Sequence, residues 1–284
     1  MPYMSVGKEN SGSIDLYYED HGSGPPVVLI HGYPLSSRAW DKQVPVLLEA
    51  GLRVITYDRR GFGKSSQPTT GYDYDTFAAD LKTLMDHLDL RDTTLVGHSM
   101  GTGEVTRYLG KYGSARVARG VLVSPIPPFL LKTADNPEGL PRSLFDGFVK
   151  SALADTPSWM KGFLDSFYNI DVLGGKLVTD PTFQSSLNVA LAASATAAVA
   201  CIPTWETDFR GDLAKIDVPI LVVDGDADRV LPFPNTGKRL TGLIKEMDLV
   251  VIEGGPHAIA WTHADRVNQA LLDFVRTTVG KRAR

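Results

Sequence analysis

Six short apolar runs, separated by segments with helical spacing, restrict most strongly how this chain can fold. They lie at residues 27–30, 52–58, 93–97, 118–124, 219–224 and 248–253, with little alternation between apolar and polar side chains. A strand without alternation is covered on both faces, which is typical of parallel sheets. Helical spacing occurs near 39–50, 76–89, 100–113 and 263–278. The sequence therefore predicts an α/β fold with a mostly parallel central sheet and helices on both faces.

The alternation of strand and helix patterns stops between Ser124 and Asp212. The segment opens with the proline-rich SPIPP and continues with helical patterns but no convincing run of central strands. We therefore expect residues 1–124 and 213–284 to form one core domain, with residues 125–212 inserted as a mostly helical cap. Within the cap, the stretch NVALAASATAAVACI is too short and too rich in Ser, Thr and Ala to span a bilayer, so it predicts a packed helix.

Composition narrows the possible partners and the compartment. Lys and Arg number 29 against 33 Asp and Glu, a net charge of -4, and no long basic stripe is present, which argues against nucleic-acid binding. Cys201 is the only cysteine, so an internal disulfide is excluded and a reducing compartment is favoured. The first residues lack the apolar segment of a signal peptide. We expect a cytoplasmic protein that does not bind membranes.

The motif GHSMG places Ser99 between two glycines, after one expected strand and before a helix. Such a turn is so tight that the residues two before and two after the serine need almost no side chain. The serine then projects at the top of the sheet, where its hydroxyl can attack a carbonyl. The amide of Met100 points into the same space from a helix N-terminus and can stabilise an oxyanion. A chance G-x-S-x-G loop is the plainer alternative, which the flanking strand and helix disfavour.

Serine alone is a poor nucleophile, so an acid and a base should follow it in the order Asp, His. VVDGDADRVLP and EGGPHAIAWTHAD both follow buried strands, at the edge where doubly wound sheets place their sites. His257 is the best general base. Asp224 still belongs to the strand and Asp226 lies in a tight turn, where an aspartate can cap its own backbone. Asp228 lies further into the loop and is the preferred acid.

Two other histidines have expected structural roles. His98 should help to shape the turn at Ser99, and His31 should brace the loop HGYP, which follows the run at 27–30. The useful group of that loop is the amide of Tyr33, which can complete an oxyanion hole with Met100. A plain turn at the end of a strand is the alternative. In the expected cap, Trp159, Phe163 and Phe167 recur every four residues and form one apolar stripe on a helix, either lining a substrate pocket or packing the cap onto the core.

Six motifs together carry a resemblance that covers nearly the whole chain: HGYP, DRRGFGKS, GHSMG, TDFRGDL, GDADRVLP and GGPHAIAWTHAD. They resemble the α/β-hydrolase superfamily, and specifically the cofactor-free bacterial haloperoxidases, or perhydrolases, and related aryl esterases. TDFRGDL and the segment from PH to THAD are more specific to this family, whereas the glycine patterns occur throughout the superfamily. The resemblance implies Ser99, Asp228 and His257 as a catalytic triad. The chain departs from the family at Ala258, where glycine is common, and at Tyr33.

The resemblance also implies the reaction. Ser99 forms an acyl-enzyme from a short carboxylic acid or ester; water then gives esterase activity, whereas hydrogen peroxide gives a peracid that oxidises bromide or chloride. This chemistry implies no metal and no other cofactor, and a homo-oligomer is expected from the family. A proline such as Pro34 accompanies perhydrolases in that family, so we expect it to orient the Tyr33 peptide towards the pocket.

Of three rival interpretations, the sequence excludes one and leaves two. A dehalogenase or epoxide hydrolase of this fold would have aspartate in place of Ser99, so those are excluded. Lactonase, lactamase and carbon-carbon bond hydrolase activities would use the same triad and stay open. A non-catalytic ligand receptor on this scaffold is disfavoured because all three catalytic residue types are in place.

Overall fold

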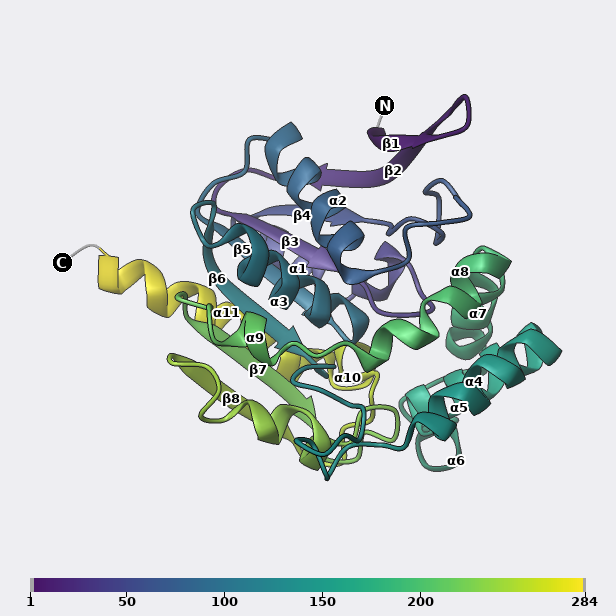
Figure 1. Ribbon diagram of the computed structural model, residues 1–284. Coiled ribbons are helices and arrows are strands. Elements are labelled where there is room, and N and C mark those ends of the chain that lie inside the picture. The colour runs from purple at the N-terminus through teal and green to yellow at the C-terminus, as the bar shows by residue number, and fades with distance from the viewer. Residues whose placement is uncertain (1–2, 283–284) are drawn as a thin grey trace.

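The fold is an eight-stranded sheet covered by helices, seen in a computed structural model that describes residues 3–282 (Figure 1). The strand order is β1-β2-β4-β3-β5-β6-β7-β8. The strands are β1 (Tyr3–Glu9), β2 (Gly12–His21), β3 (Pro26–Ile30), β4 (Arg53–Tyr57), β5 (Thr93–His98), β6 (Val117–Val123), β7 (Ile220–Gly225) and β8 (Met247–Ile252). Neighbouring strands from β4 to β8 run parallel, which confirms the predicted α/β class.

The six predicted runs correspond to β3 through β8, but β1 and β2 were not predicted. These two strands pair with each other antiparallel, and β2 continues antiparallel onto β4. β1 has exposed and buried positions mixed along one hairpin arm. An edge hairpin of this kind is half-solvated and rich in polar residues, so it lacks the continuous apolar run that identified the central strands.

The helices divide between the two faces of the sheet and one end of it. The longer ones are α2 (Tyr74–His87), α3 (Met100–Tyr112), α4 (Arg142–Ala154), α5 (Thr156–Tyr168), α7 (Asp180–Leu191) and α11 (Ala264–Arg282). The shorter ones are α1 (Val44–Glu49), α6 (Ile170–Leu173), α8 (Ala195–Ala200), α9 (Arg210–Leu213) and α10 (Ile259–Thr262). Four 3₁₀ helices complete the set: η1 (Ser37–Trp40), η2 (Ile202–Glu206), η3 (Phe233–Asn235) and η4 (Gly237–Leu240).

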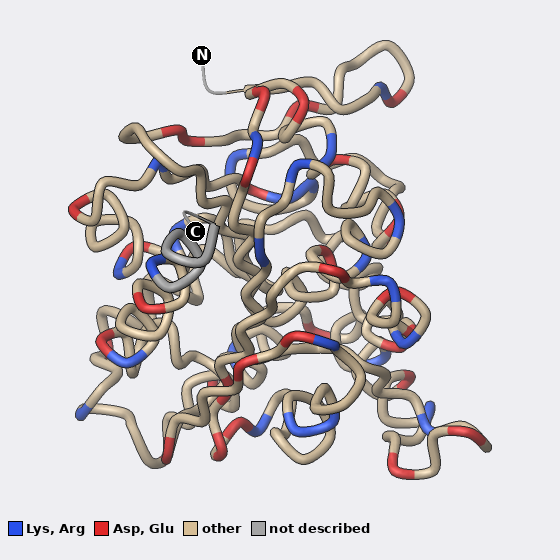
Figure 2. The backbone as a smooth tube through the Cα atoms, turned by 90° about the vertical axis from the view of Figure 1, so that its left-hand side faces the viewer, with Lys and Arg blue, Asp and Glu red and all other residues tan. Residues whose placement is uncertain are grey.

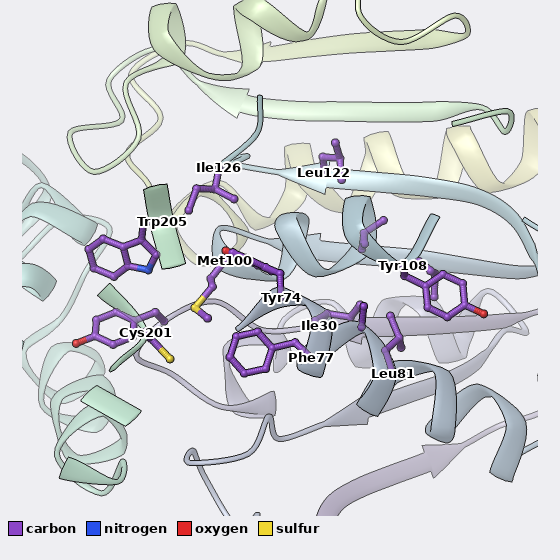
Figure 3. Close-up of a cluster of buried hydrophobic side chains, with 14 of the residues drawn as sticks. Ile30, Tyr74, Phe77, Leu81, Met100, Tyr108, Leu122, Ile126, Cys201 and Trp205 are labelled. Carbon is purple, nitrogen blue, oxygen red and sulfur yellow. The ribbon is translucent and has the colours of Figure 1, made fainter. Parts of the chain in front are cut away.

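Two apolar clusters explain why the central strands lack alternation. Along β3, Val28 and Ile30 join the cluster that contains α2 and α3, whereas Val27 and Leu29 join the cluster that contains α1 and α11. Successive side chains of a strand point to opposite faces, and here both faces are dry. The first cluster extends past Met100 to Trp205, so the helices over the sheet and the segment between β6 and β7 share apolar packing (Figure 3).

Helices α4 to α8 lie between β6 and β7 in sequence and gather beside the carboxyl ends of the parallel strands (Figure 1). The apolar stretch at 188–202 is not one helix as predicted: α7 ends at Leu191, and α8 begins at Ala195 after Ser194, whose side chain accepts a hydrogen bond from the Ala197 amide. Serine favours such N-cap positions over helix interiors, which explains the break. Among residues 3–282, no single helix has the length and apolar character to cross a membrane; α7 and the segment Ala195–Glu206 meet those criteria only together, as a pair bent by 100°.

Charged residues of both signs are scattered among one another over the backbone (Figure 2). Many form local ion pairs, such as Arg53 with Asp20 at 2.7 Å and Arg107 with Asp212 at 2.8 Å. Mixed charge of this kind does not concentrate the positive potential that phosphate backbones require.

Candidate active site

The turn at Ser99 joins the end of the central strand β5 to the start of α3. Ser99 has φ 54° and ψ −121°, an unusual conformation for a residue with a side chain. A Cβ atom at Gly97 would lie 2.4 Å from the Gly101 carbonyl oxygen, and one at Gly101 would lie 2.4 Å from the Ile30 carbonyl oxygen. The prediction that both flanking positions must lack side chains is confirmed. The turn is tight because the first turn of α3 packs directly against the ends of β3 and β5.

Ser99, His257 and Asp228 form a continuous hydrogen-bonded line, although they come from loops after three different strands. His257 Nε2 lies 2.8 Å from Ser99 Oγ, and His257 Nδ1 lies 2.6 Å from Asp228 Oδ2. A carboxylate only accepts, so Nδ1 carries the proton and Nε2 is free to accept from the serine hydroxyl. All three residues are buried. The line can therefore take a proton from Ser99 as its oxygen attacks a carbonyl.

The three candidate aspartates occupy different environments. Asp228 Oδ1 accepts from the amides of Val230 and Leu231, both at 2.8 Å, which fixes the carboxylate that faces His257. Asp226 Oδ1 instead accepts from the Gly254 amide at 2.7 Å in an exposed loop. Asp224 is buried at the end of β7, and its burial, followed by the nearby charge of Asp228, raises its pKa to about 8. Only Asp228 touches the histidine.

His98 and Ser124 hold the backbone of the histidine loop. His98 Nε2 lies 3.0 Å from the carbonyl oxygen of His257, and Ser124 Oγ donates to the same oxygen at 3.1 Å. A carbonyl cannot donate, so Nε2 is the protonated nitrogen of His98. Burial, and then the neighbouring His257, lower the pKa of His98 to about 3, so the ring stays neutral. His98 therefore positions His257 as well as the turn at Ser99.

The loop after β3 brings Tyr33 beside Ser99. A Cβ atom at Gly32 would lie 2.7 Å from Ser99 Cβ, so the loop can pass this close only because residue 32 is glycine. His31 accepts from the Arg59 amide at 2.9 Å and contacts the Gly32 carbonyl at 2.8 Å, which confirms its predicted bracing role. The Tyr33–Pro34 peptide bond is cis. Met100 is the first residue of α3, and amides of a first helical turn lack acceptors within the helix.

A buried ion pair, which was not predicted from the sequence, holds the loop after β3 through a hydrogen bond to its backbone. Arg59 binds Glu104 of α3 through Nε and Nη2, at 3.0 and 2.8 Å, and Nη2 also donates to the His31 carbonyl at 3.0 Å. Tyr57 donates to the other oxygen of Glu104. The only available signal was the motif DRRGFG, which does not say which arginine is buried or with what it pairs.

Two cavities lie beside the hydrogen-bonded line from Ser99 to Asp228. The larger, of about 770 Å³, is lined by Ser99 and Tyr33 and by Trp159 and Phe163 of the expected aromatic stripe. The smaller, of about 90 Å³, is lined by His98 and Phe167. The ring of Phe167 lies 5.0 Å from that of His257, so the two rings pack against each other. Pro34 is buried and does not line either cavity.

The thiol of Cys201 does not compete with Ser99 as a nucleophile. Burial raises the pKa of the Cys201 thiol to about 12, which keeps it protonated and weakly nucleophilic. In the part of the chain that the structure describes, no group of three His, Cys, Asp or Glu side chains is arranged to hold a metal ion.

Comparisons with known proteins find relatives that are similar to this chain over nearly its whole length. It is 61% identical over 276 residues, 97% of this chain and 100% of the relative, to a Synechocystis sp. protein whose name, non-heme chloroperoxidase, is itself provisional. It is 35% identical to the bifunctional esterase/perhydrolase of Acinetobacter calcoaceticus, over 93% of this chain and 97% of that one. The crystal structure of a bromoperoxidase from Bacillus anthracis superposes with a TM-score of 0.92, at 44% identity, over 96% of this chain and 99% of the other. Residues 25–264 match the alpha/beta hydrolase fold family, and the chain belongs to that family.

Proposed function

We propose that this protein is a serine hydrolase that transfers acyl groups to water or to hydrogen peroxide. The observation that carries the proposal is the hydrogen-bonded line from Ser99 through His257 to Asp228, at 2.8 and 2.6 Å. Ser99 is the nucleophile, His257 the general base and Asp228 the residue that orients the histidine. The amides of Tyr33 and Met100 form the oxyanion hole. The names of relatives, which include non-heme chloroperoxidases and an esterase/perhydrolase, support the same reaction.

In the first step, Ser99 Oγ attacks the carbonyl carbon of an ester or acid while its proton passes to His257 Nε2. The tetrahedral oxyanion accepts from the two amides, and the leaving alcohol or water takes the proton from His257 as the acyl-enzyme forms. Water or peroxide then attacks the acyl carbon, and His257 takes its proton and returns it to Ser99. Water gives the carboxylic acid. Peroxide gives a peracid, which passes its terminal oxygen to bromide or chloride and leaves hypohalous acid and the carboxylate.

Three further parts of the proposal rest on the architecture and the family. Residues 125–212 act as a cap that closes the acyl site over the core formed by 1–124 and 213–284. Pro34 acts by shaping the Tyr33 loop from its buried position, since it does not face either cavity. The protein works in the cytoplasm as a homo-oligomer, with small carboxylic acids or esters and peroxide as its substrates.

Replacement of Ser99 by Ala tests the shared acyl-enzyme. We expect ester hydrolysis and peroxide-dependent bromination to fall together, by roughly 10³-fold or more, because triad residues act as a unit. Ser13→Ala, at an exposed position on β2, is the control and should leave both rates unchanged. Bromination that survives while hydrolysis disappears would refute the common intermediate. A serine-directed phosphonate that fails to label the native enzyme would instead favour the ligand receptor.

A further inference from the structure

The larger cavity is much bigger than a short acyl group needs. It measures about 770 Å³ and includes Ser99 in its lining. A water molecule occupies about 30 Å³ in the liquid, and an acetyl group is equivalent to only a few waters. Volumes of this size are typical of sites that enclose drug-sized ligands. An acetyl-enzyme would therefore leave most of the cavity unfilled.

The wall of this cavity is mostly apolar, and six of its residues are aromatic. Tyr33, Phe163 and Trp205 contact one another, with ring centroids 5.2 to 6.0 Å apart. Phe148 and Trp159 extend the same wall, with centroids 5.3 Å apart. Aromatic side chains offer large apolar area at low entropic cost and favour contact with aryl or alkyl groups.

The charged side chains of the lining already have partners. Asp155 caps α5 through its contacts with the Ser158 amide and hydroxyl, at 3.0 and 2.5 Å. Arg229 binds Asp171 at 2.7 Å and lies half in solvent. Among the lining residues that the structure describes, both charged side chains therefore already have a partner. A charged group on the acyl chain would lose hydration there and would have to compete with these existing partners.

Gly162 lies on α5 and lines the cavity, yet neither conformation nor close packing requires a glycine there. Its φ is not positive, and a Cβ atom added at this position would meet nothing within 4 Å. Glycine weakens a helix interior relative to alanine, so its presence has no local benefit. What it provides is open space on the face of α5 that carries Trp159 and Phe163.

We propose that this site is built for uncharged, apolar acyl groups larger than acetyl, either medium-chain or aryl-substituted, and that Gly162 sets the space available to them. This inference rests on the acyl-transfer function proposed above. It names the acyl class that the cap selects and identifies a residue that determines specificity.

A series of acyl chains tests the substrate class. Hydrolysis of the methyl esters of acetic, butanoic, hexanoic, octanoic and 3-phenylpropanoic acids keeps the leaving group constant, and perhydrolysis of the free acids gives a second profile. We expect kcat/KM to rise by up to about fourfold per buried methylene, and at least tenfold from acetyl to octanoyl. The monomethyl ester of hexanedioic acid should be at least tenfold poorer than methyl hexanoate. A flat profile, a preference for acetyl, or equal use of the charged half-ester would overturn the inference.

Gly162→Leu tests the specificity determinant, with Gly147→Leu as the matched control. Gly147 also lies on a cap helix with nothing within 4 Å of an added Cβ, but it does not line the cavity. We expect Gly162→Leu to lower the octanoyl-to-acetyl ratio of kcat/KM at least tenfold and Gly147→Leu to leave it unchanged. Ser166→Leu, on the same cavity face, provides a second variant if the first is poorly folded. An unchanged ratio in both cavity variants contradicts the assignment.

The two proposals fail in different ways. A native enzyme that hydrolyses acetyl esters through Ser99 but shows no preference for larger acyl groups contradicts only the substrate class. A native enzyme that turns over no member of the series, and is not labelled at Ser99, contradicts the acyl-transfer function itself.

Discussion

The catalytic edge and the cap wall of this protein are held together by different kinds of interaction. The catalytic edge is the site proposed above, Tyr33, Ser99, Asp228 and His257, in loops after β3, β5, β7 and β8, and hydrogen bonds of 2.6 to 2.8 Å fix the last three. The cap wall consists of Phe148, Trp159, Phe163 and Trp205, whose rings meet at 5.3 to 6.3 Å. Hydrogen bonds weaken steeply with misalignment, whereas apolar packing tolerates exchange of shape at constant volume. Reaction class should therefore be fixed at the edge, and substrate choice at the wall.

The strongest test of this contrast is Asp228→Asn. The amide keeps the size of the side chain but can no longer enforce the histidine tautomer or stabilise the imidazolium, so we expect kcat to fall by about 10⁴-fold. Asp226→Asn, two residues earlier, should change kcat less than tenfold, because Asp226 binds only the Gly254 amide in an exposed loop. Steady-state hydrolysis of one aryl ester measures both. A larger loss in Asp226→Asn would reverse the assignment of the acid.

Asp224→Asn tests whether the buried carboxyl group of Asp224, near Asp228, is protonated in the folded protein. In the folded protein the pKa of Asp224 is raised to about 8, against an ordinary value near 4 when unfolded. Between those values the native state keeps a proton that the unfolded state loses, so this group makes stability fall as pH rises from about 4 to 8. The asparagine variant lacks that contribution. Its unfolding free energy should fall less between pH 5 and 8, by an amount on the order of a few kcal/mol.

Urea denaturation at the two pH values measures this difference. Asp226→Asn makes the same replacement of a carboxyl group at an exposed neighbouring position and serves as the control. If both variants keep the pH dependence of the parent, then Asp224 does not hold a proton in the folded protein.

The sequence predicted the catalytic edge far better than the cap wall. Ser99, Asp228 and His257 each follow a recognisable strand, and parallel strands bring their carboxyl ends to one edge whatever the rest of the chain does. Local spacing was therefore sufficient to bring these residues together. The supporting contacts of Glu104 and Ser124 were missed, because buried polar partners from distant segments leave no periodic signal.

The cap wall could be predicted only in part. The four-residue spacing of Trp159, Phe163 and Phe167 identified one helix face, but α5 passes over both cavities, so Phe167 faces the smaller one. Trp205 and Phe148 come from other elements and join the wall through tertiary packing alone. The break between α7 and α8 was not predicted, because Ser194, which caps α8, lies in a stretch with the composition of one apolar helix.

Tyr33 contacts both the catalytic edge and the cap wall, so removing its hydroxyl tests whether the two regions act independently. The hydroxyl donates to the Ala198 carbonyl at 2.8 Å and accepts from Trp159 Nε1 at 3.0 Å, while its backbone lies beside Ser99. Tyr33→Phe leaves the buried Ala198 carbonyl and the partly buried Trp159 N–H without this partner, which should lower the unfolding free energy by about 1–2 kcal/mol. Tyr72→Phe, which removes another buried hydroxyl that donates to a backbone carbonyl, is the control for stability alone. We expect both variants to lose stability, but only Tyr33→Phe to change the octanoyl-to-acetyl ratio of kcat/KM, by a few-fold, because only its hydroxyl ties the oxyanion loop to the wall. Equal acyl profiles in the two variants would mean that the edge and the wall act independently.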